Sequence, residues 1–335
     1  MLPIPEFFTP ETVGTVYRVD YADRSTTALE YRSRYGLLPA ADAKQKNWLL
    51  LVDVQNTFCI PGFELFVGGR SGIGAVDDNR RLCEFIYHNL AAITHISATL
   101  DTHTAMQIFH PLFFVDELGS HPAPYTDIHL EDLLAGKWHF NPDLAQHFGI
   151  TPEYGQKIVL HYTETLAKKG KYALTIWPYH AMLGGVGHAL VSAVEEAIFF
   201  HSVARLSQAQ FEIKGDRPFT ENYSVIGPEV LNGPEGEVLG VRNTKFIDQL
   251  KEVDRLIIAG QAKSHCVAGT ISDLLDDIQL TDPGLADKVY LLQDCTSPVV
   301  VPGVVDHSAE ADAAFARFAA AGMHLVWSTN PMGSW

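Results

Sequence analysis

The stretch Trp48-Leu49-Leu50-Leu51-Val52-Asp53 decides the fold. Its apolar run, from Trp48 to Val52, is too short for the core of a helix and ends at polar residues, so it predicts a buried strand. Strands that are apolar on both faces are typical of parallel sheets that helices cover on either side. The stretch therefore indicates an α/β protein.

The alternation of strands and helices continues along the chain. Residues 73–93 carry apolar side chains near a period of 3.6, which predicts a helix, and the run Ile96–Leu100 predicts a second strand that closes on Asp101. Further strands are expected at Phe211–Ile213, Arg255–Ala259, Val289–Leu292 and His324–Trp327, and further helices at 243–252, 266–277 and 308–321. Together these elements predict a three-layer α/β/α sandwich with a mainly parallel sheet.

Two regions do not follow this alternation. Residues 1–45 are polar and loop-like, and residues 104–176 combine Pro, Gly and several His residues with short helical pieces such as 130–136. We therefore expect an N-terminal extension over 1–45 and one domain over 46–330 that carries 104–176 as a large insertion. An independent domain over 104–176 is the weaker alternative.

Composition and charge exclude several classes of protein. Of the 335 residues, 47% are hydrophobic and 19% are charged, which is typical of a globular chain rather than a disordered one. The formal charge of -16 repels phosphate backbones and anionic membrane surfaces, so neither nucleic acid nor a membrane is expected as a partner. The first residues lack the basic region of a signal peptide, and no apolar run reaches about 18 residues, so we expect a soluble cytoplasmic protein. The four cysteines have no CxxC spacing, which argues against a zinc knuckle or a disulfide framework.

Cys266 is the first candidate for chemistry, because it lies where a strand ends in a small-residue turn and a helix begins. Unpaired N–H groups and the positive end of the helix dipole favour a thiolate at such a place, and the same N–H groups can hold an oxyanion. A buried cysteine that acts as a small hydrophobe is the ordinary alternative. The turn alone favours neither interpretation.

Several further reactive groups follow strands of the predicted sheet. Asp53, Asp101 and Cys266 come at or after strand ends, and Lys214 follows the strand at Phe211–Ile213. Ligands of parallel sheets bind beyond the carboxyl ends of the strands, so these groups are expected on one rim. The ordinary alternatives are that Asp53 caps a loop and that Lys214 is a solvated side chain. A thiol, a carboxylate and an ammonium on one rim make a covalent hydrolase chemically coherent.

A metal site is the second hypothesis. Asp101 and His103 are two residues apart, so in extended structure they point to the same side, and His180 is a possible third ligand because Pro178 stiffens its approach. A hydrogen-bonded Asp/His pair in a loop is the alternative. The remaining histidines are interpreted as surface or core residues, including His110, His121, His139 and His161.

Five segments, taken in order, resemble motifs of the nicotinamidase/isochorismatase-like cysteine hydrolases, most closely the metal-containing nicotinamidase branch. They are Asp53-Val-Gln-Asn-Thr-Phe58 with Pro61-Gly62 and Val67-Gly-Gly69, Asp101-Thr-His103, Trp177-Pro-Tyr-His180 with Gly184-Gly-Val-Gly187, Lys214-Gly215 with Asn222-Tyr-Ser224, and Gly260-Gln-Ala-Lys-Ser-His-Cys266-Val267. The resemblance involves residues 46–330 except the insertion, and it implies the isochorismatase-like hydrolase fold.

The resemblance also implies a role for each matched residue. Cys266 would be the nucleophile, Asp53 the base that takes its proton, and Lys214 the cation that stabilises the charged pair. The N–H groups of Ala262 and Cys266 would form the oxyanion hole, next to a non-proline cis peptide at Gln261-Ala262. The implied metal ligands are Asp101, His103 and His180, for Zn²⁺ first and Fe²⁺ or Mn²⁺ as alternatives, and the implied substrate-binding residues are Phe58, Trp177, Gln55 and Tyr223.

The activity that the resemblance implies is hydrolysis of a small carboxamide, with nicotinamide, cleaved to nicotinate and ammonia through a Cys266 thioester, as the leading substrate. Three departures leave the substrate open: Ala181 replaces the usual cysteine, Lys263-Ser-His265 replaces the common Thr-Asp-Tyr type of run, and a long segment separates His103 from His180. A related amidase that acts on another small amide or an N-carbamoyl compound is the alternative, and a non-catalytic metal-binding scaffold is a weaker one. The expected partners are the small-molecule amide and further copies of the chain in a homo-oligomer.

Overall fold

The computed structural model describes residues 1–169 and 173–335, and its centre is a parallel sheet of six strands in the order β12-β9-β8-β1-β2-β7. The strands are β1 (Asn47–Val52), β2 (His95–Asp101), β7 (Gln210–Lys214), β8 (Arg255–Gly260), β9 (Val289–Leu292) and β12 (His324–Val326). Each of these strands matches its predicted counterpart to within one residue at either end. The parallel sheet confirms the predicted α/β class.

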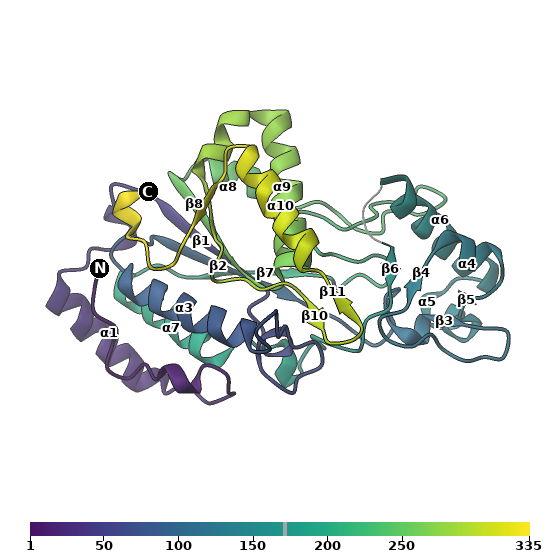
Figure 1. Ribbon diagram of the computed structural model, residues 1–335, viewed down its shortest axis with the longest axis horizontal. Coiled ribbons are helices and arrows are strands. Elements are labelled where there is room, and N and C mark those ends of the chain that lie inside the picture. Colours follow the sequence, from purple (N-terminus) through teal and green to yellow (C-terminus); the bar gives the residue numbers. More distant parts are fainter. Residues whose placement is uncertain (170–172) are drawn as a thin grey trace.

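Helices cover both faces of the sheet, as Figure 1 shows. One face carries α1 (Tyr21–Tyr35), α3 (Gly74–His88) and α7 (Ser192–Arg205), and the other carries α8 (Lys245–Lys251), α9 (Ala268–Thr281) and α10 (Ser308–Ala320). Side chains of the central strand β1 alternate between the two cores, since Leu50 packs in the cluster of Ile271 and Leu51 in that of Leu82. The three layers match the predicted sandwich.

The N-terminal segment is not loop-like, which corrects the prediction for residues 1–45. It contains helix α1, which begins where the Asp20 side chain accepts a hydrogen bond from the Asp23 N–H and ends at Gly36 in the left-handed conformation. The helix packs against α7, and Arg24 forms an ion pair with Glu196 there. Only Ala28 and Tyr31 of α1 are buried, so the helix has almost no apolar stripe that the sequence could reveal.

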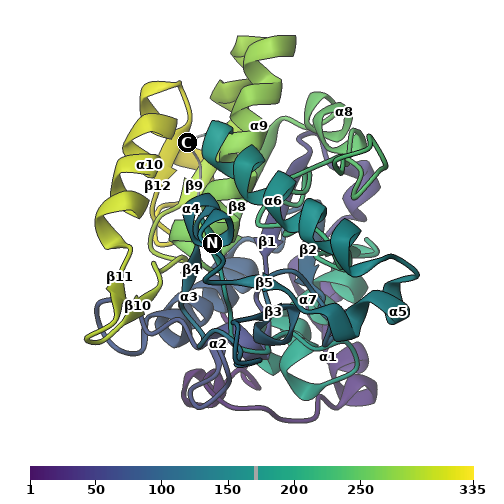
Figure 2. The ribbon, with the colours of Figure 1, turned by 90° about the vertical axis from the view of Figure 1, so that its right-hand side faces the viewer.

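Residues 104–169 and 173–176 form a small unit beyond the carboxyl ends of the strands (Figures 1 and 2). Its elements are β3 (Phe114–Val115), β4 (Asp127–Ile128), α4 (Leu130–Leu134), β5 (His139–Phe140), α5 (Ala145–Phe148), α6 (Pro152–Lys169) and β6 (Leu174–Thr175). Strand β3 pairs with β5, and β4 pairs with β6, both antiparallel. Helix α6 has 18 residues, whereas the sequence predicted only short helical pieces here.

Three short elements complete the regular structure. Helix α2 (Asn56–Cys59) follows β1, and the two-residue strands β10 (Val300–Val301) and β11 (Val305–Asp306) form an antiparallel pair after β9. Within residues 1–169 and 173–335, no helix combines the length and the apolar character that a membrane span requires.

Candidate active site

The register of the sheet brings the predicted reactive residues to one rim. Asp101 and Lys214 are partners in the β2–β7 pair, and Val52, the residue before Asp53, is the partner of Gly260 in the β1–β8 pair. The chain then passes from β8 through a turn to Cys266. Residues that lie far apart in the sequence therefore meet at the carboxyl ends of three neighbouring pairs of strands.

Asp53 is held in a conformation that few non-glycine residues adopt. Its φ is 47°, in the left-handed region, and its carboxylate is fully buried. The Asp53 N–H donates to Thr99 Oγ1 at 2.9 Å, and the Thr99 hydroxyl donates to Asp53 Oδ1 at 2.5 Å. Thr99 thus fixes one oxygen of the carboxylate and leaves Oδ2 for other partners.

Lys214 connects the buried acidic groups with the thiol. Its Nζ lies 2.8 Å from Asp53 Oδ2 and 3.0 Å from Asp101 Oδ1, and it donates to the Asn222 carbonyl at 2.9 Å. The same nitrogen lies 3.6 Å from Cys266 Sγ. Burial alone lowers the pKa of Lys214, but the carboxylates of Asp101 and Asp53 more than offset this, so its pKa lies well above the ordinary value. The site therefore contains a permanent ammonium.

Cys266 and Asp53 both favour their neutral forms, because burial raises the pKa of each. Burial raises the pKa of Cys266 well above its usual value, and the charge of Lys214 opposes this only in part, while Asp53 and Asp101 raise it further. Burial likewise raises the pKa of Asp53, against the effect of Lys214. Burial and the nearby carboxylates therefore favour the neutral thiol, whereas the Lys214 ammonium favours the thiolate. A thiolate requires proton transfer to a partner.

The turn before Cys266 is built on a close approach of two strands. Gly260 has a φ of 121°, and a Cβ at this position would lie 2.0 Å from the Val52 carbonyl oxygen, so only glycine fits. The next peptide bond, Gln261-Ala262, is cis, and the Gln261 side chain is held by Asp78 through a hydrogen bond of 2.9 Å. Residues Lys263–Val267 then form one π-helical turn that leads into α9. Ala262 and Cys266 both line the cavity described below.

Asp101, His103 and His180 form a buried cluster whose ligand atoms all lie within 4.8 Å of one another. Nε2 of His103 lies 2.8 Å from Asp101 Oδ2, and Nε2 of His180 lies 3.5 Å from the same oxygen. Each ring is oriented from behind, because Nδ1 of His103 contacts the Gly215 carbonyl at 3.0 Å and Nδ1 of His180 contacts the Pro178 carbonyl at 2.7 Å. A carboxylate and two imidazoles that converge through Nε2, with Nδ1 donating to carbonyls, fit a divalent transition metal.

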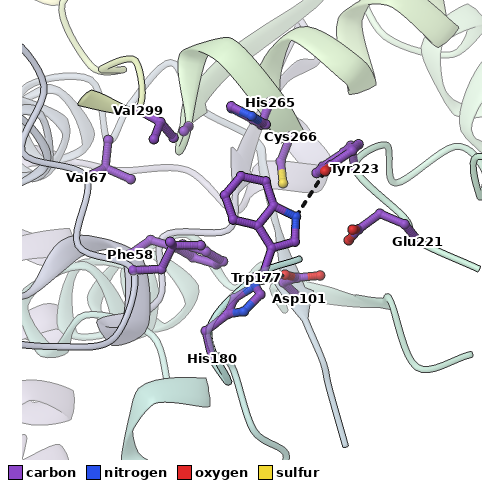
Figure 3. A pocket seen from close by; sticks show the side chains of 12 residues that line it. Phe58, Val67, Asp101, Trp177, His180, Glu221, Tyr223, His265, Cys266 and Val299 are labelled. Atoms are coloured by element: carbon purple, nitrogen blue, oxygen red, sulfur yellow. Dashed lines mark hydrogen bonds and ion pairs between the residues drawn. The ribbon is translucent and has the colours of Figure 1, made fainter. Parts of the chain in front are cut away.

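A cavity opens onto these groups (Figure 3). Three of the four residues predicted to bind the substrate line it, namely Phe58, Trp177 and Tyr223. The Trp177 indole donates to the Tyr223 hydroxyl at 3.0 Å, which fixes one aromatic wall. The apolar walls and the few polar groups are typical of a site for a small, flat ligand.

Gln55, the fourth predicted residue, does not line the cavity. Its amide nitrogen donates to the carbonyls of Asp101, at 2.8 Å, and His188, at 2.9 Å, while its oxygen accepts from the Asp101 N–H. Gln55 therefore holds the backbone of a predicted metal ligand rather than facing a substrate.

The cavity is also lined by residues to which the sequence analysis gave no role in the site. They are Leu65, Val67, Glu221, His265 and Val299. The position of His265 beside Cys266 was a usable signal, whereas Val299 arrives from the segment after β9 and nothing in its sequence context marks it. Glu221 is buried and lies in the segment between Lys214 and Tyr223, and burial raises its pKa to about 8.

Comparisons with known proteins agree with this fold. No family model matches the sequence, and no curated protein matches it. Among solved structures, the chain is similar to the Acinetobacter baumanii nicotinamidase/pyrazinamidase, with 18% identity, a TM-score of 0.50, and coverage of 86% of this chain and 99% of that one. It is similar in the same way to the yeast nicotinamidase Pnc1p bound to the inhibitor nicotinaldehyde, with 16% identity, a TM-score of 0.50, and coverage of 84% and 99%. The predicted resemblance is confirmed for the fold: the chain has the isochorismatase-like α/β fold of these nicotinamidases.

Proposed function

We propose that this chain is a metal-containing cysteine hydrolase that cleaves a small carboxamide, with nicotinamide as the leading substrate and nicotinate and ammonia as the products. One observation carries the proposal: a single buried ammonium, Lys214 Nζ, lies 2.8 Å from the carboxylate of Asp53 and 3.6 Å from the thiol of Cys266, beside a cavity with aromatic walls. A base, a nucleophile and a cation in contact are the parts that nucleophilic catalysis requires.

The proposed reaction proceeds through a thioester. Asp53 takes the proton of Cys266, and the thiolate sulfur forms a bond to the amide carbon while the N–H groups of Ala262 and Cys266 hold the oxyanion. The C–N bond then breaks, and protonated Asp53 returns its proton to the leaving nitrogen, which departs as ammonia. Asp53 next removes a proton from water, which attacks the thioester, and the acid and the Cys266 thiol are released. Lys214 keeps the ionised states of the pair accessible in a buried site.

Asp101, His103 and His180 would hold the metal ion, with Zn²⁺ as the first choice and Fe²⁺ or Mn²⁺ as alternatives. When bound, the ion would supply a Lewis acid that orients the substrate. Phe58 and Trp177 would enclose the ring between aromatic faces, so that its carboxamide lies at Cys266. The aromatic walls would thus bind the ring of the substrate, and the groups around Cys266 would bind its carboxamide.

A related amidase is the second candidate, because Glu221 and His265 place unexpected polar groups in the cavity. An ammonia-release assay separates the two, with nicotinamide, pyrazinamide, small aliphatic amides and N-carbamoyl compounds as substrates and the metal content measured on the same sample. We expect nicotinamide to be hydrolysed. Activity on aliphatic amides alone would overturn the proposed substrate.

Cys266→Ala tests the nucleophile itself. We expect it to abolish ammonia release and to leave the metal content unchanged, while Cys83→Ala, which removes a buried thiol of α3, retains activity. Ammonia release by the Cys266 variant would contradict the mechanism. Selective alkylation of Cys266 at neutral pH would argue against a non-catalytic metal-binding scaffold, and an inert thiol would favour it.

The cytoplasmic location and the homo-oligomer are also proposals. The first is tested by fractionation of cells that express the full chain, and the second by light scattering of the purified protein.

A further inference from the structure

A second, larger pocket lies at the opposite edge of the sheet from Cys266. It is formed where the N-terminal segment lies beside the amino end of β1, the loop before β2 and the end of α7. Its lining residues are Leu2, Tyr35, Gly36, Leu37, Leu38, Asp42, Ala43, Lys44, Gln45, Asn47, Ala91, Ala92 and Arg205. None of these residues belongs to the candidate active site.

Arg205, the last residue of α7, contributes a buried cation to this pocket. Its exposed fraction is only 2%, and two of its three guanidinium nitrogens have no hydrogen-bond partner among the described residues. The nearby charge that acts on it is that of Arg32, which is also positive, and burial together with Arg32 lowers the pKa of Arg205. Because buried polar groups are normally hydrogen-bonded, these two nitrogens require an explanation.

The two unpaired nitrogens of Arg205, Nε and Nη2, lie on one edge of its guanidinium group. Nη1 donates to the Ala91 carbonyl at 2.9 Å, whereas Nε and Nη2 have no hydrogen-bond partner among the described residues. The N–H groups of Nε and Nη2 lie on the same edge of the planar guanidinium, and this edge pairs with two oxygens of one carboxylate or phosphate. The free edge is therefore the one that recognises an oxyanion.

Asn47 is a second, independent sign of a ligand. Its side chain is buried at the start of β1 and donates to the Ala92 carbonyl at 2.9 Å, but its Oδ1 is buried without a partner among the described residues. The two residues that carry these buried, unpartnered atoms, Arg205 and Asn47, thus line the same pocket. Lys44 also lines it, against one acidic residue, Asp42, in a chain whose net charge is -16.

We infer that this pocket binds a small oxyanion, a carboxylate or a phosphate, through the free edge of Arg205, and that Asn47 Oδ1 accepts from a donor group where the ligand carries one. This inference does not depend on the proposed hydrolase activity, because it uses no residue of that site. The pocket could accept the anion alone or as one end of a larger molecule. Its natural source is distinguished by testing carboxylates and phosphate separately.

The test is calorimetric titration of the purified full chain with acetate, nicotinate and orthophosphate. We expect saturable binding of at least one of them at one anion per chain. Arg205→Lys keeps the charge but loses the edge with two nitrogens, so we expect affinity to fall at least about ten-fold, and Arg205→Met should abolish binding. Arg34→Gln, an exposed arginine of α1 outside this pocket, is the matched control and should bind as the unmodified chain does.

Lys44→Gln provides a variant that cannot disturb the core, because Lys44 is exposed. We expect it to weaken binding by about two- to five-fold through the lost charge. The inference is overturned if none of the three anions binds the unmodified chain saturably. It is equally overturned if a folded Arg205 variant binds as tightly as the unmodified chain, because the anion would then lie elsewhere, for example at the candidate active site.

Discussion

Lys214 Nζ lies 3.0 Å from Asp101 Oδ1, and the two residues are register partners on β2 and β7. Because Asp101 belongs to the metal cluster and Lys214 also contacts Asp53, one ion pair joins the two halves of the site. The sheet register, rather than a loop, sets this distance. A change at Lys214 should therefore act on both the thiol chemistry and the metal cluster.

Lys214→Met removes the one cation that pairs with Asp53 among the described residues, and it also removes one of the groups that stabilise the charge of Asp101. Removing one partner of a buried ion pair costs about 3–5 kcal/mol, so we expect a loss of this size in the free energy of unfolding. Ammonia release should fall at least about 100-fold, because the ionised thiol would lose its cation. Urea unfolding and steady-state assays measure the two effects. Lys251→Met, at an exposed ion pair with Asp248 within α8, is the control, and equal behaviour of the two variants would contradict the role of Lys214.

A second prediction concerns pH and is independent of catalysis. His201 is buried in α7, its Nε2 donates to the Ile93 carbonyl at 3.0 Å, and burial lowers its pKa to about 4 from 6.5. Between these values the unfolded chain binds a proton that the native chain does not, so stability falls as the pH drops from 6.5 to 4. His201 should account for about 1–3 kcal/mol of this loss.

His201→Gln keeps a side chain that can donate a hydrogen bond to the Ile93 carbonyl but that does not bind a proton in this pH range. We expect its free energy of unfolding in urea, with EDTA present, to decrease less between pH 7 and pH 4.5 than that of the unmodified chain. Identical decreases in both proteins would show that His201 does not control the acid sensitivity.

The predicted parts of the fold were those with strong local patterns. Strand β1 is buried at all six positions, so its apolar run identified it directly. Helix α7 escaped prediction because it buries Glu196, His201 and Arg205 along with its apolar residues, which breaks the stripe that periodicity detects. Helix α1 was not predicted because it buries only two residues, which are too few to form an apolar stripe.

The site residues that lie within the matched motifs could be predicted from the sequence. The residues of the metal cluster and of the Cys266 turn lie together in the structure, although the sequence places them far apart. Gln55 was misassigned because a motif gives residue types and spacing, but not which backbone groups the side chain contacts. Glu221 and Val299 could not be found from local sequence, because their positions depend on how long segments fold over the rim.

Gly215→Ala tests the metal cluster through its geometry. A Cβ at Gly215 would lie 2.7 Å from Asp101 Oδ1 and 2.8 Å from His103 Cε1, so either ligand must move. We expect zinc affinity, measured by competition with a chromogenic chelator, to fall by about 10- to 100-fold. Gly62→Ala has a similar positive φ, +89° against +78°, but meets no atom within 4 Å, so it controls for backbone strain alone. Equal zinc affinities in the two variants would contradict the assignment of this cluster as a metal site.

Trp177 tests the recognition of a flat substrate. Its ring forms one wall of the cavity, and its N–H donates to the Tyr223 hydroxyl at 3.0 Å. Trp177→Ala removes the wall, so kcat/KM for nicotinamide should fall about 10- to 100-fold, mainly through KM, while Trp177→Phe retains a flat face and should lose less than about ten-fold. Steady-state kinetics on both variants, with thermal unfolding to verify folding, provide the measurement. An unchanged KM in folded Trp177→Ala would mean that the substrate does not stack on this residue, and the cavity would then have to bind its ligand through the polar end alone.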